Sequence, residues 1–167
     1  MVKGLNIDST LVGCVIQGTR DGLSMAEVEV DAVGASRFNS ESRDLSVLVG
    51  LHGRCNGSMT LNLSKRTAIF LASKFIGEEL TDLDEDTIDA ICEIGNIVAG
   101  SFKMLLKETE YEFETISLPA LIFGGNYNLY YFKNITTASV TFEIPEVSVV
   151  HVADKFFSTS ISLLGHS

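Results

Sequence analysis

The sequence contains no apolar run that approaches the roughly 20 residues needed to cross a bilayer as a helix. Its first residues show no long apolar stretch and no small-residue cleavage site, so no secretory signal is apparent. Only three cysteines occur in 167 residues, an odd number at wide spacing, which disfavours a disulfide framework. These absences predict a cytoplasmic protein in a reducing compartment.

Clustered positive charge is also missing. Lysine and arginine total 12 against 22 aspartates and glutamates, which gives a formal net charge of −10, and the basic residues are scattered. Nucleic acid and anionic membrane both attract proteins through a local positive field, so we expect neither as a partner. The three histidines are isolated and no spacing resembles a zinc site. No Gly-x-Ser-x-Gly, P-loop or dinucleotide motif appears.

The remaining composition, 46% hydrophobic and 20% charged, is typical of a packed globular protein. Its length fits one domain over residues 1–167, with the tail from about residue 154 left unassigned. Periodicity and capping residues predict the following elements: a helix over 6–17, a turn at 19–22, a strand at 27–33, a hairpin from 45–51 and 55–63, a helix over 65–77 capped by Ser64, a long helix from about 84 to about 107, a segment at 111–118 ended by Pro119, and strands at 128–132, 137–144 and 147–152.

The order of these elements repeats weakly along the chain. Residues 5–80 are expected to form a helix, three strands and a helix, and residues 84–152 a helix followed by three or four strands. No linker rich in proline, glycine or serine separates the two stretches. We therefore predict an α+β fold in which an antiparallel β-sheet packs against long helices and two pseudo-repeated halves form one domain.

The long helix carries the most informative pattern. Six residues spaced 4, 3, 4, 3 and 4 apart fall within an arc of roughly 80° at about 100° per residue: Asp89, Glu93, Asn96, Gly100, Lys103 and Lys107. Nearly opposite are apolar residues that should face a core: Ile91, Ile94, Val98, Phe102 and Leu105. The outer face thus presents a carboxylate and a carboxamide one turn apart, a candidate for holding a water molecule or a partner's polar group.

A solvated helix face is the simplest explanation of such a stripe, since exposed polar residues are the norm. Two features favour a function. Asn96 is a mediocre residue for a helix interior, and Gly95 and Gly100 each cost about 1 kcal/mol relative to alanine. A glycine at position 100 would let another surface approach, whereas Gly95, nearer the apolar side, is better explained by tight internal packing. Ile97 and Met104 flank the stripe and suit either a docking surface or cover by a neighbouring loop.

The acidic loop before this helix gives a calcium interpretation little support. Asp82, Asp84 and Asp86 occupy the first, third and fifth places of a twelve-residue loop that ends at Glu93. The sixth place requires glycine for a sharp turn and holds Thr87, and helical periodicity runs through the region. A calcium-sensing module is therefore the third of the functional alternatives.

The pattern Asp89-x3-Glu93-x2-Asn96-x22-Pro119 resembles the active-site signature of the CheC/CheX/FliY chemotaxis phosphatases, and all four positions match. The surrounding sequence, DAICEIGNIVAGSFKMLL, is similar to the central helix of that family, and the likeness covers most of residues 5–152. CheC-type members carry one such motif in each half. Because the first helix here has no Glu-x-x-Asn, the chain is closest to the CheX members.

The resemblance implies a phosphatase that acts on the aspartyl phosphate of a CheY-like response regulator. Asn96 would orient the attacking water, Glu93 would engage a basic group of the partner, Asp89 and Gly100 would support them, and Pro119 would shape the wall beside the helix. It further implies a homodimer and no cofactor in this chain, because the magnesium ion would belong to the response regulator. The alternative is a non-catalytic adaptor that binds a response regulator or a flagellar switch component through the same surface.

Overall fold

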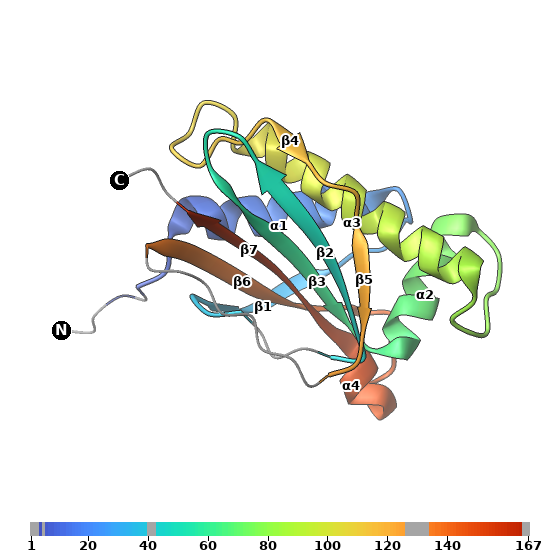
Figure 1. Cartoon of the computed structure of the whole chain (residues 1–167). Coiled ribbons are helices and arrows are strands. Elements are labelled where there is room, and N and C mark those ends of the chain that lie inside the picture. The colour runs from blue at the N-terminus through green and yellow to red at the C-terminus, as the bar shows by residue number, and fades with distance from the viewer. Residues whose placement is uncertain (1–3, 5, 40–42, 126–133, 165–167) are drawn as a thin grey trace.

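A seven-stranded antiparallel sheet carries two long helices on one face (Figure 1). The computed structural model describes residues 4, 6–39, 43–125 and 134–164. The elements are α1 (Ser9–Ser24), β1 (Asp31–Ser36), β2 (Leu45–His52), β3 (Asn56–Leu63), α2 (Lys65–Ile76), α3 (Glu85–Leu105), β4 (Thr115–Ile116), β5 (Ala120–Phe123), β6 (Ile135–Glu143), the 3-10 helix η1 (Val149–His151), α4 (Val152–Lys155) and β7 (Phe156–Leu164). The predicted α+β class is confirmed. None of the described helices is both long and apolar enough to cross a membrane.

The strand order, β1-β6-β7-β3-β2-β4 with β5 also pairing to β2, explains the weak repeat in the sequence. Each half supplies one hairpin, β2–β3 or β6–β7, and the hairpins meet where β3 pairs with β7. The strands that precede each hairpin pair with the hairpin of the other half, so that β1 pairs with β6, and β4 and β5 pair with β2. The two pseudo-repeated halves are thus interleaved in one sheet, with α1 and α3 packed side by side against it.

The first helix is longer than predicted. It begins after Asp8, whose carboxylate accepts a hydrogen bond from the Leu11 amide at 2.9 Å, and it continues through the predicted turn at 19–22. That expectation was wrong because Gly18 and Gly22 serve the contact with α3. A Cβ at Gly22 would collide with the Val98 side chain and would lie 3.3 Å from its backbone nitrogen. The glycines therefore permit close approach of two helices and do not end one.

The central hairpin and α2 form where predicted. Ser64 caps α2 by accepting from the Thr67 amide at 3.1 Å, and Gly77 ends the helix in the left-handed region with a φ of 82°. In α3 the proposed packing role of Gly95 is confirmed, because a Cβ there would lie 2.6 Å from Val47 Cγ1 of β2. The ends of α2 and the role of Gly95 were thus predicted correctly from the residue types and their positions in each helix.

Two predicted strands differ from the structure. The alternation at 27–33 is real, since Val28 and Val30 are buried, but pairing starts only at Asp31. The chain first reverses after α1, where Glu27 has a φ of 54° and donates its amide hydrogen to the Ser24 carbonyl. In place of the strand predicted at 147–152, the chain has an irregular connection at 147–148, then η1 and the start of α4. The strand predicted at 128–132 lies outside the described residues.

The ambiguous tail forms β7, a central strand between β6 and β3. One of its faces carries Phe157, Ile161 and Leu163 with the buried Thr159 among them, while the other carries Ser158, Ser160 and Ser162, all buried. These hydroxyls are paired within the sheet: Ser160 donates to Ser139 at 2.8 Å and Ser158 accepts from Asn62 at 3.3 Å. Hydrogen-bond partners on the neighbouring strands thus allow a serine-rich segment to be buried.

Candidate functional site

Helix α3 presents the polar stripe to the outside. Asp84 caps its first turn, Glu85 and Asp86 complement the positive end of the helix dipole, and the core face is at most 1% exposed at Ile91, Ile94, Val98 and Phe102. Two predicted positions differ. Leu105 is 40% exposed and does not join the core, and Lys107 lies beyond the end of the helix at Leu105. The stripe on the helix therefore consists of Asp89, Glu93, Asn96, Gly100 and Lys103.

Glu93 and Asn96 lie one turn apart on this face. Glu93 is exposed and Asn96 is half-buried. Among the residues that the structure describes, neither side chain has a hydrogen-bond or ion-pair partner. A carboxamide has two donor hydrogens and an acceptor oxygen, so an unengaged Asn96 can orient a water molecule from either end.

The surroundings of this pair are open on one side and walled on another. A Cβ added to Gly100 would meet nothing within 4 Å, so this glycine has no packing role inside the protein. Asp89 is exposed one turn before Glu93. Pro119 is half-buried in the connection between β4 and β5, two strands that both contact α3. The five predicted site residues thus belong to α3 and to the connection beside it.

A groove of about 440 Å³ lies between the end of α2 and the first half of α3. It includes Asp89 and Glu93 of the stripe, and its remaining lining includes Phe75, Ile76 and Glu78, which the sequence analysis did not select. The available signal was the apolar last turn of α2 directly before the acidic loop. The groove therefore joins the stripe to a surface of mixed apolar and acidic character.

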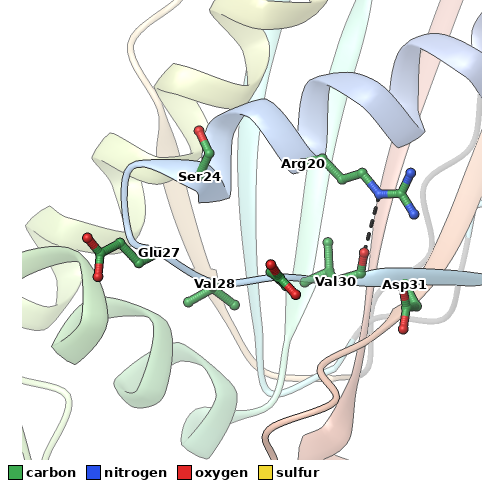
Figure 2. A pocket seen from close by; sticks show the side chains of 7 residues that line it. Arg20, Ser24, Glu27, Val28, Val30 and Asp31 are labelled. Atoms are coloured by element: carbon green, nitrogen blue, oxygen red, sulfur yellow. Dashed lines mark hydrogen bonds between the residues drawn. The ribbon is translucent and has the colours of Figure 1, made fainter.

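A second hollow, of about 510 Å³, lies between α1 and the segment 27–31 and contains no residue of the stripe (Figure 2). Its one basic side chain in the lining, Arg20, is partly engaged, because its Nε donates to the Val30 carbonyl at 3.3 Å. Glu29 and Asp31 in the same lining carry the opposite charge. The α2–α3 groove, and not this hollow, adjoins the candidate site.

The acidic loop is engaged within the fold. Lys65 Nζ lies 2.9 Å from the Asp82 carboxylate, and this interaction lowers the pKa of Asp82. Hydrogen bonds from the backbone amide and hydroxyl of Thr87 lower the pKa of Asp84, which caps α3. Across the described part of the chain, no group of three His, Cys, Asp or Glu side chains is arranged to hold a metal ion. Asp82 and Asp84 are thus engaged in an ion pair and a helix cap.

The thiol beside the stripe is not poised for nucleophilic attack. Burial raises the pKa of Cys92, and the nearby Asp89 carboxylate raises it further. The thiolate is the reactive form of cysteine, so a raised pKa leaves Cys92 in its unreactive form near neutral pH. The chemistry of this face therefore depends on its carboxylates and its carboxamide.

Comparison with known proteins identifies the family of this chain. The family described as chemotaxis phosphatase CheX matches residues 45–143, more than half of the chain. The protein named CheY-P phosphatase CheX from Thermotoga maritima is 26% identical over 150 residues, which cover 89% of this chain and 96% of that protein.

Solved structures show the same fold. A CheX–CheY–BeF3–Mg²⁺ complex from Borrelia burgdorferi contains a chain that is 26% identical, with a TM-score of 0.64 and coverage of 89% of this chain and 97% of that one. The chemotaxis protein CheX from Desulfovibrio desulfuricans has a TM-score of 0.75 over 92% of this chain and 98% of that one. Its identity of 21% supports a common fold and nothing more specific.

Proposed function

This chain belongs to the chemotaxis phosphatase CheX family, and from that premise we propose that it hydrolyses the aspartyl phosphate of a CheY-like response regulator. The relative from Thermotoga maritima is named a CheY-P phosphatase, and the relative from Borrelia burgdorferi occurs in a complex with CheY. The observation that carries the proposal is the unpartnered pair of Glu93 and Asn96 on the outer face of α3.

The proposed reaction is an in-line attack of water on phosphorus. The new bond forms between the water oxygen and phosphorus, the bond from phosphorus to the aspartyl oxygen breaks, and inorganic phosphate and a free carboxylate result. Such transfers depend mainly on positioning and on charge stabilisation, so no nucleophile from this protein is needed. Asn96 enters the partner's site, and its carboxamide holds the water opposite the leaving oxygen.

The neighbouring residues fix the encounter. Glu93, one turn toward the amino end of α3, pairs with a basic group of the response regulator and sets the register of docking. Asp89 supports Glu93 from the next turn. Gly100, with open space where a side chain would be, lets the partner's surface close over Asn96. Pro119 shapes the wall beside the helix.

The identity of the partner determines which protein holds the metal ion and in which compartment the reaction takes place. The magnesium ion belongs to the response regulator, and this chain supplies no cofactor. Both proteins act in the cytoplasm. A homodimer would form through a sheet edge, for which β1 is the candidate, because all six of its residues are exposed at the border of the sheet.

Phosphate release from a panel of phosphorylated CheY-type receiver domains tests the proposal. The parent chain should accelerate release from at least one of them, and Asn96→Ala should remove the acceleration. Gln17→Ala, an exposed position on α1, is the matched control and should retain it. Tight binding of a receiver domain without any acceleration would instead support the non-catalytic adaptor.

A further inference from the structure

The groove between α2 and α3 combines an apolar floor with an acidic rim. Phe75, Ile76 and Leu80 supply apolar lining, and Ile76 is 41% exposed. The rim carries Glu78 and Asp86 in addition to the stripe residues Asp89 and Glu93. The groove thus places an exposed isoleucine and two further apolar side chains beside four carboxylates.

The charges of this rim are not balanced within the chain. No basic residue lines the groove, and among the described residues none of its four carboxylates forms an ion pair. The nearest lysine along α2, Lys74, is paired with Glu146 at 2.8 Å, and Lys65 at the other end of α2 is paired with Asp82. The negative charge of the groove is therefore not neutralised by a lysine or arginine of the described structure.

We propose that this groove receives a long basic side chain, lysine or arginine, from the same response regulator that docks on Glu93 and Asn96. This inference rests on the proposed function. The groove shares Asp89 and Glu93 with the stripe, so a partner seated on the stripe covers it. The aliphatic stem of such a side chain packs on Phe75 and Ile76 while its charged head meets the rim carboxylates.

A second copy of this chain is a poor occupant by comparison. Its net charge is also −10, so it would bring like charge to the acidic rim. A partner with a basic surface gains both faster encounter and correct orientation from the same carboxylates. The groove then acts as a specificity element that separates cognate from non-cognate response regulators.

The test uses the receiver domain that the parent chain dephosphorylates best. The double variant Glu78→Gln with Asp86→Asn keeps the shape of the rim and removes two charges distant from the proposed catalytic pair. We expect KM to rise about 5- to 10-fold at low salt with kcat unchanged, and the difference to shrink at high salt, since rim charges act through screened attraction. The control Glu79→Gln with Glu85→Gln changes neighbouring carboxylates that do not line the groove, and should leave KM within twofold.

The apolar half of the proposal has its own variant. Ile76→Ser removes an exposed apolar side chain and should raise KM about 3-fold at all salt concentrations, since packing is not screened. Unchanged KM in both the double variant and Ile76→Ser would overturn the proposal. A shift in the monomer–dimer equilibrium on Ile76→Ser without a change in KM would also overturn it, because the groove would then be a contact between copies.

Direct binding separates this inference from the proposed function. The dissociation constant is measured with the same kind of receiver domain activated by BeF3 and Mg²⁺, without turnover. If the parent binds but does not hydrolyse, and the double variant binds more weakly than its control, the groove proposal holds while the phosphatase proposal fails. If hydrolysis requires Asn96 but the double variant binds as tightly as the parent, the groove proposal fails alone. If no receiver domain binds, both fail.

Discussion

Helices α1 and α3 occupy equivalent places in the two halves of the sheet, yet only α3 has a free polar face. Residues 76 positions apart correspond, beginning with the two capping residues Asp8 and Asp84. The buried positions match one for one over nearly four turns of helix: Leu11, Cys14, Val15, Gly18, Thr19, Gly22 and Leu23 in α1 against Thr87, Ala90, Ile91, Ile94, Gly95, Val98 and Ala99 in α3. The scaffold is therefore repeated at the level of single side chains.

The outer faces are where the two helices differ. Gln17 and Arg20 occupy in α1 the places of Glu93 and Asn96 in α3. Gln17 donates to Asp21 at 2.7 Å and Arg20 donates to the Val30 carbonyl, so both are engaged within the chain. The same backbone thus supports a structural face in one half and an unengaged polar pair in the other. Function depends on those side chains and not on the fold alone.

The largest effect on stability should come from the connection that distinguishes the two hairpins. Residues 53–55 link β2 to β3, whereas 144–155 link β6 to β7 around the buried Lys155. Its Nζ donates to the carbonyls of Ile144, Pro145 and Val147 and lies 3.2 Å from Glu143. Lys155→Met keeps the volume but removes the cation beside Glu143 and the donor to the Pro145 and Val147 carbonyls, while the Ile144 carbonyl still accepts from the Val147 amide. The free energy of unfolding should therefore fall by about 2–3 kcal/mol.

Urea denaturation measures this loss. Lys74→Met removes an exposed ion pair with Glu146 and should change stability by less than about 1 kcal/mol. Equal effects of the two substitutions would show that Lys155 does not organise the longer connection.

Two glycines, one in each helix and at non-equivalent positions, should respond in opposite directions to substitution by alanine. Gly22→Ala places a methyl group against the backbone of Val98 and should lower the free energy of unfolding by about 1–2 kcal/mol, after the better helix propensity of alanine is included. Gly100→Ala meets open space and should raise it by up to about 1 kcal/mol. In phosphate release, Gly100→Ala should raise KM, because the added methyl group stands where the partner approaches. Stabilisation by both substitutions would contradict the tight crossing of the helices.

The cap of α1 adds a pH dependence in the alkaline range, whereas the lowered pKa of Asp84 at the cap of α3 acts in the acidic range. Tyr111 donates to Asp8 at 2.7 Å, and burial, followed by the contact with Asp8, raises the pKa of Tyr111 to about 12. An unfolded tyrosine has a pKa of about 10. The folded state therefore keeps a proton that the unfolded state loses, and this stabilisation is complete below about pH 10 and disappears as the pH rises toward 12.

Thermal unfolding between pH 9 and pH 12 tests that dependence. In Tyr111→Phe the decline of the melting temperature over this range should be shallower than in the parent. Parallel curves would show that the bond to Asp8 does not link this titration to folding.

The smallest effect, no change in phosphate release, is expected when the motif is transferred to α1. Gln17→Glu with Arg20→Asn installs the motif on α1, in a chain that also carries Asn96→Ala. We expect no recovery of phosphate release, because the segment before β1 lies against position 20, where the Val30 carbonyl accepts from Arg20. Recovery would show that two side chains on any such helix are sufficient.

The sequence predicted those features that depend on local signals. Helix α2 has a serine cap and a terminal glycine, and the outward stripe of α3 depends only on helical periodicity. The features it missed depend on distant partners. Gly18 and Gly22 of α1 are explained only by Phe102 and Val98 of α3, and the buried serines of β7 only by hydroxyl and amide groups on β3 and β6.

The candidate site divides in the same way. Glu93 and Asn96 could be selected from spacing and composition, because both lie on one helix. The groove could not, because its floor comes from the last turn of α2 and its rim from the following loop and α3. Burial of Leu105 was wrongly expected, since periodicity gives a direction around the helix but not the point at which the neighbouring core ends.

The most direct test of the account separates chemistry from binding at Asn96. Single-turnover dephosphorylation at saturating concentration of this chain gives the rate of the chemical step, and titration with the BeF3-activated receiver domain gives the dissociation constant. For Asn96→Ala we predict a rate about 100-fold below that of the parent, as expected when a reacting water is no longer positioned, with the dissociation constant within twofold. An unchanged rate, or a loss explained entirely by weaker binding, would contradict the assignment of Asn96 to the water.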